Sequence, residues 1–111
     1  MTDKILIIIS TAEIGKALTG MMYAINTAKY RWMNEVKLFF FGPAEELLAN
    51  SSKLQQSLKE YHEINEPAMA CKFITDRDGN GEQIARLGVK VEYVGKIISD
   101  LIKAGYIPMV W

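Results

Sequence analysis

Short apolar segments alternate along this chain with segments of helical periodicity, and this alternation limits the fold more than any other feature. Residues 5–9 are continuously apolar and mostly β-branched, and residues 38–41 form a second such run. Continuous apolar runs are typical of strands covered on both faces, as in parallel sheets. Both runs are far shorter than the ~20 residues of a membrane span. We therefore expect buried strands connected by helices.

The remaining elements are predicted from periodicity, proline and glycine. Helical spacing of apolar residues covers 14–28, 43–50, 54–64 and 97–102, with a break at 50–52. Ser10 and Glu13 match a capping box before the first helix, and Pro43 suits the first turn of the second. A third strand is expected at 67–73, followed by a polar loop at 75–81, a short helix at 81–87, and strands at 89–94 and 106–111. Pro108 lacks an amide donor, which indicates an edge strand.

This order predicts a single α/β domain over residues 1–111, with a mainly parallel sheet and helices on both faces. In such sheets, ligands bind at the carboxyl ends of the strands. Ser10 and Thr11 follow the first strand, Gly42 and Pro43 follow the second, and a polar loop follows Cys71. We expect these residues to form one shallow binding site.

Composition excludes several classes of function. The 111 residues carry 13 basic and 13 acidic side chains, so there is no basic surplus for nucleic-acid phosphates. One cysteine cannot form an intramolecular disulfide. The first residues lack the pattern of a secretory signal. We expect a soluble cytoplasmic protein that binds neither nucleic acid nor membrane.

Cys71 is the main candidate for chemistry, and two interpretations are open. A thiolate is stabilised by helix N-termini and by nearby cations, and Lys72 and Arg77 are close in the sequence. A lone cysteine in an apolar strand is, however, also typical of a small buried hydrophobic residue. The pattern alone favours the second interpretation.

Metal and nucleotide sites are not indicated. Residues 76–81 match the first six positions of an EF-hand loop, but position twelve is Leu87, where a glutamate is required. A polar turn explains the same residues. His62 is the only histidine, so neither a multi-histidine metal site nor a Ser-His-Asp triad can form within one chain. No glycine-rich phosphate-binding motif follows the first strand. We expect no metal and no cofactor.

Nearly the whole chain resembles the DsrE/DsrF-like proteins, a family of small sulfur-relay and related domains, and particularly its short archaeal-type members. The resemblance begins with the 4–9 strand and Ser10-Thr11, and includes Phe40-Phe41-Gly42-Pro43 and Ala70-Cys71-Lys72. Its most specific part is the closing stretch, residues 88–95, 98–102 and 105–108.

The resemblance implies a three-layer α/β/α fold with a five-stranded parallel sheet of order 4-3-2-1-5. Right-handed crossovers would then place three connections on one face and only the last on the other. It also implies a homo-oligomer, commonly a trimer or hexamer. In sulfur-relay members, the cysteine in the position of Cys71 carries a persulfide between donor and acceptor proteins, and Lys72 or Arg77 would here stabilise the thiolate.

The alternative is a non-catalytic homo-oligomeric binding module of the same fold. In that case a small ligand or partner occupies the cleft at the strand ends, and Cys71 is structural. The loop after Cys71 is more acidic than a thiolate-activating site requires, because it contains Asp76 and Asp78.

Overall fold

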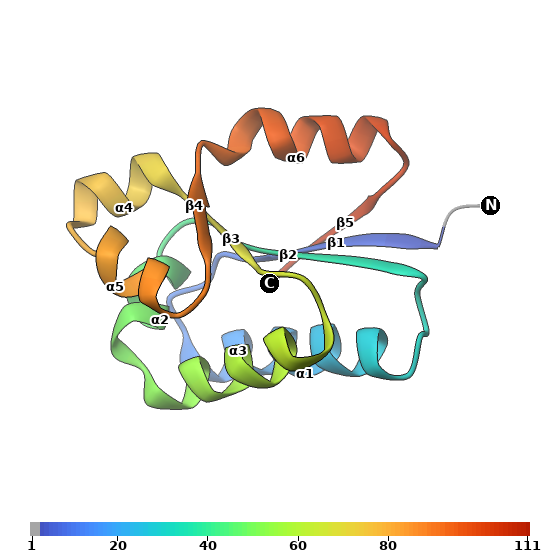
Figure 1. The fold of residues 1–111 in the computed structure, drawn as a ribbon, viewed down its shortest axis with the longest axis horizontal. Helices are drawn as coiled ribbons and strands as arrows, with labels where there is room; N and C mark the ends of the chain where they lie inside the picture. The colour runs from blue at the N-terminus through green and yellow to red at the C-terminus, as the bar shows by residue number, and fades with distance from the viewer. Residues whose placement is uncertain (1–2) are drawn as a thin grey trace.

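A computed structural model describes residues 3–111 as a parallel sheet between two layers of helices (Figure 1). The strand order is β4-β3-β2-β1-β5, which confirms the predicted α/β/α architecture and places Pro108 on an edge strand. The elements in chain order are β1 (Lys4–Ile9), α1 (Ile14–Lys29), β2 (Glu35–Phe40), α2 (Ala44–Asn50), α3 (Ser52–Ile64), β3 (Met69–Cys71), α4 (Lys72–Asp78), α5 (Gly81–Arg86), β4 (Lys90–Glu92), α6 (Val94–Lys103) and β5 (Ile107–Val110).

The central strand β1 is apolar from Ile5 to Ile9 because helices cover both faces of the sheet. Ile5, Ile7 and Ile9 point into a larger core. Leu6 and Ile8 point into a smaller core on the opposite face. Figure 1 shows α1 and α3 together on the first face and α6 on the second. The sheet therefore separates two apolar clusters of unequal size.

The second face has much less cover than the first. Only α6 runs along it, and Val94 is the one residue of that helix that is fully buried. The β3–β4 connection differs from the expected arrangement. Ile84 of α5 packs in the larger core, whereas Ile74 of α4 packs in the smaller one. Among residues 3–111, none of the helices has the length and apolar character needed to cross a membrane.

The segment after Cys71 differs most from prediction. The strand expected at 67–73 is only Met69–Cys71, and much of the expected loop is the helix α4. Lys72 pairs with Asp76 one turn later, which supports the helix. Gly79 then ends it in the left-handed conformation with φ 72°. Residues that are typical of polar turns therefore form the helix α4 and its C-terminal cap.

The first helix also begins differently from the predicted capping box. The amide of Glu13 donates to Oγ1 of Thr11 rather than to Ser10. Glu13 is itself the N-cap residue, and its carboxylate accepts from the amides of Gly15 and Lys16. The capping-box prediction was wrong because the helix begins three residues later than that motif requires.

Candidate functional site

A cleft of about 350 Å³ lies where β1, β2 and β5 end, and it contains several of the predicted binding residues. Its lining includes Ser10, Thr11 and Pro43, together with Lys16 and Trp111. The amides of Ser10 and Thr11 donate to the carbonyl oxygen of Trp111, over 2.8 and 3.1 Å. Those amides are thus already bonded within the chain. Among the lining residues, Ser10 and Thr11 carry hydroxyl groups and Lys16 carries an ammonium group.

Gly42 lies beside this cleft and must be glycine for two reasons. Its φ of 116° lies in a region that residues with a side chain rarely adopt. A Cβ atom at this position would also be only 2.8 Å from Oγ of Ser10. Gly42 therefore lets the end of β2 approach the end of β1 closely.

Cys71 is not part of the cleft. It is the last residue of β3 and the N-cap of α4, and only 7% of its surface is exposed. It belongs to the smaller core, whose other buried members are Leu6, Ile8, Phe39, Ile74, Val94 and Tyr106. The cleft lining therefore includes Ser10, Thr11 and Pro43 but not the predicted sulfur carrier.

The two cations predicted to assist Cys71 are engaged by carboxylates. Nζ of Lys72 lies 2.7 Å from Oδ2 of Asp76, and that hydrogen bond raises the pKa of Lys72. The same ammonium lies 5.7 Å from the centre of the Tyr93 ring. Nε of Arg77 lies 3.1 Å from Oδ1 of Asp78. Each positive charge is therefore balanced by an adjacent negative charge.

Glu45 also lies in this region, and the sequence analysis did not identify it as a candidate site residue. Its side chain is fully buried at the start of α2. Oε2 accepts from the amide of Cys71 over 3.3 Å and from the amide of Gly42 over 3.4 Å, whereas Oε1 has no hydrogen-bond partner. Burial raises the pKa of Glu45 to about 7, against the opposing effect of the two amides. A carboxyl group that gains and loses a proton near neutrality thus joins the ends of β2 and β3.

No sequence signal points to this role of Glu45. Two glutamates, Glu45 and Glu46, begin the same helix, and only the packing of α2 against α4 and α5 buries the first. Acidic residues are common in a first helical turn for electrostatic reasons alone. The contact with Cys71 spans 26 positions of sequence and depends on the tertiary fold.

The structure also bears on the calcium interpretation of residues 76–81. Asp76 and Asp78 lie in α4 rather than in a loop, and each is paired with a cation. Within residues 3–111, no group of three or more histidine, cysteine, aspartate or glutamate side chains is arranged to hold a metal ion.

Comparison with known proteins adds one structural relative. No family model matches the chain, and no curated protein matches it. A solved structure of a conserved protein of unknown function from Bacteroides thetaiotaomicron aligns with 98% of this chain and 95% of its own, with a TM-score of 0.91 and 24% identity. The likeness establishes the fold. The relationship to the DsrE/DsrF-like family stays a prediction from sequence.

Proposed function

We propose that this protein is a non-catalytic, homo-oligomeric binding module with a DsrE/DsrF-like fold, and that Cys71 is a structural residue. The observation that carries this proposal is the burial of Cys71 in an apolar cluster, with no part in the lining of the strand-end cleft. Reactive cysteines are partly exposed and lie in electropositive surroundings. Cys71 has neither property, because Lys72 and Arg77 pair with carboxylates.

The cleft at the strand ends is the binding site in this proposal. Two hydroxyl groups and one ammonium group line it beside the apolar surfaces of Pro43 and Trp111. This combination suits a small polar molecule that accepts hydrogen bonds. Sites of this kind lie at the carboxyl ends of parallel strands, where loops converge.

Association of subunits, as a trimer or hexamer in the cytoplasm, is the second part of the proposal. It is supported by large apolar side chains that are exposed around the carboxyl ends of the strands. Phe73 is 66% exposed and Tyr93 62%, and they follow the neighbouring strands β3 and β4. Adjacent exposed apolar groups are typical of interaction surfaces. Burying them against a second subunit would remove them from water.

Sulfur carriage is the second candidate function, and one observation favours it. Cys71 is the N-cap residue of α4, and no side chain caps the amides of that first turn. In this mechanism the thiolate of Cys71 attacks the outer sulfur of a donor persulfide. The new bond joins the two sulfur atoms, and the donor thiolate leaves. The transferred sulfur then passes to an acceptor protein in the reverse reaction.

Mass spectrometry after incubation with a persulfide donor separates the two candidates. If Cys71 is structural, incubation changes neither the mass of the native wild type nor the mass of Cys71→Ser. A gain of one sulfur atom by the wild type alone would replace the binding-module proposal with the sulfur-carrier one.

A further inference from the structure

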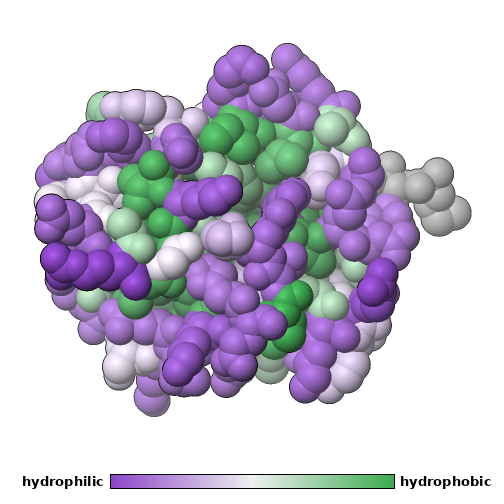
Figure 2. All heavy atoms as spheres, in the orientation of Figure 1, coloured by the Kyte–Doolittle hydropathy of each residue, from purple (hydrophilic) through white to green (hydrophobic). Residues whose placement is uncertain are grey.

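An apolar groove lies under α6, and its lining includes Met69 and Lys90, the first residues of β3 and β4. Its volume is about 200 Å³, and the apolar residues that line it come from β2, β3, α6 and the loop before β3: Leu38, Phe39, Met69, Ile97, Leu101 and Pro67. Figure 2 shows hydrophobic atoms directly beneath α6 on the face that Figure 1 presents. The groove lies on the face with the smaller core, where α6 and Ile74 of α4 provide the helical cover.

The sheet register fixes which side chains face the groove. Lys90 pairs with Met69, and Met69 pairs with Phe39, so these residues form one row across three strands. Paired residues of parallel strands point to the same face. Lys37 lies two residues before Phe39 on β2 and therefore also points to this face. Two lysines thus lie at the border of an apolar surface.

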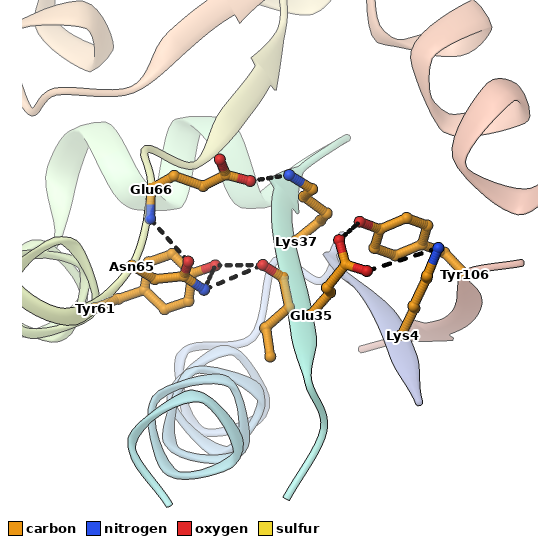
Figure 3. A network of polar contacts seen from close by, with 8 residues as sticks. Lys4, Glu35, Lys37, Tyr61, Asn65, Glu66 and Tyr106 are labelled. Carbon is orange, nitrogen blue, oxygen red and sulfur yellow. Dashed lines mark hydrogen bonds and ion pairs between the residues drawn. The ribbon is translucent and has the colours of Figure 1, made fainter. Parts of the chain in front are cut away.

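The charges at the border are unequal. Lys37 forms an ion pair with Glu66, as Figure 3 shows. Lys90 is exposed and lies within ion-pair distance of no carboxylate among residues 3–111. The groove lining therefore includes two positive charges and one negative charge. The unpaired positive charge favours an anionic group at this position.

The ion pair also lies between the groove and a second cavity. Lys37 and Glu66 line both the apolar groove and a polar cavity of about 320 Å³ at the amino end of β2. In Figure 3, Glu35 on the same strand is held by Lys4 and Tyr106, on the other side of Lys37 from Glu66. Lys37 is thus held in place by its ion pair with Glu66.

We propose that this groove binds a small aliphatic carboxylate. The alkyl chain lies against Met69, Ile97 and Leu101, and the carboxylate pairs with Lys90 at the border next to Lys37. The volume of about 200 Å³ is several times the ~30 Å³ occupied by one water molecule, which accommodates a short alkyl chain. A mostly apolar cavity with a few placed polar groups is the usual form of a small-molecule site. This inference is independent of the strand-end cleft and of Cys71.

The test is a titration of the methyl-labelled full chain with hexanoate, followed by NMR. Hexan-1-ol and hexylammonium are the matched probes without a charge and with the opposite charge. We expect saturable shifts of the Met69, Ile97 and Leu101 methyl signals with hexanoate, and binding of hexylammonium at least about fivefold weaker. Absence of saturable shifts at these methyl groups overturns the proposal. Equal affinity for hexanoate and hexylammonium also overturns it, because the lysines would then contribute nothing.

Charge-reversal variants locate the head group. Lys90→Glu should weaken hexanoate binding at least about fivefold, because an attraction becomes a repulsion. Lys53→Glu is the matched control, since Lys53 is an exposed lysine on α3, on the opposite face. It should bind hexanoate like the wild type. Equal loss in both variants would show only a general effect of charge and would overturn the assignment to Lys90.

Discussion

The backbone amide of Cys71 donates a hydrogen bond to Oε2 of Glu45 over 3.3 Å, which connects the end of β3 with the first turn of α2. The same oxygen accepts from Gly42 at the end of β2. One buried carboxyl group thereby fixes the relative position of two strand ends. Burying this ionisable group is unfavourable, but the group satisfies the hydrogen bonds of two backbone amides.

Glu45 should make the stability of the protein depend on pH. Its folded pKa of about 7 lies above the value of 4.5 for an ordinary glutamate. The folded state therefore holds the proton more tightly, so the free energy of unfolding should fall as pH rises from about 4.5 to 7. The full effect is roughly 3 kcal/mol, since one pKa unit corresponds to about 1.4 kcal/mol. Urea unfolding between about pH 5 and pH 8 measures it.

Glu45→Gln should flatten this dependence, because glutamine does not titrate. Glu46→Gln is the control, since Glu46 neighbours Glu45 on the same helix but is exposed. It should keep the wild-type slope. The assignment fails if Glu45→Gln and the wild type lose equal stability over this pH range.

Gly42→Ala should destabilise the protein by roughly 2–4 kcal/mol, through backbone strain and a clash with Ser10. Gly79→Ala is a matched control because Gly79 also has a positive φ, of 72°, but a Cβ there meets no atom within 4 Å. It should cost only about 1–2 kcal/mol, the penalty of a Cβ in the left-handed conformation. Urea unfolding of both variants gives the difference. Equal losses would show that Oγ of Ser10 does not exclude a side chain at position 42.

If the subunits associate as proposed, Phe73→Glu should weaken their association by about tenfold or more, because it would place an unpaired charge in the proposed interface. Light scattering coupled to size-exclusion chromatography reports the molar mass at several concentrations. Met22→Glu serves as the control. Met22 is 58% exposed but lies on α1, which covers the larger core, on the other face of the sheet from Ile74 of α4. A wild-type protein that stays monomeric at all concentrations, or equal loss in both variants, would contradict the proposed surface.

Much of the fold could be predicted because, in strongly periodic segments, the spacing of the apolar residues indicates which side chains are buried. The apolar run at 5–9 and the helical spacing at 14–28 correspond to β1 and α1. Pro108 correctly indicated an edge strand, because proline has no amide hydrogen to donate to a second neighbouring strand. These features depend on a residue and its close neighbours in sequence.

The parts that could not be predicted depend on contacts between distant residues. The helix α4 contains Asp76 and Asp78 and is followed by Gly79, so its local composition is typical of a turn. Thr75 is nevertheless buried in the folded protein, and that burial comes from tertiary packing. Similarly, Glu45 and Glu46 look equivalent in sequence. The groove under α6 depends on how few helices cover one face of the sheet.

The rate at which iodoacetamide alkylates Cys71 in the native protein tests the central claim most directly. A packed thiol reacts only when the surrounding structure opens. We therefore expect a native rate at least about a hundredfold below that of the urea-unfolded chain, rising with urea in parallel with unfolding. A native rate close to that of the unfolded chain would contradict the account and would favour sulfur carriage by Cys71.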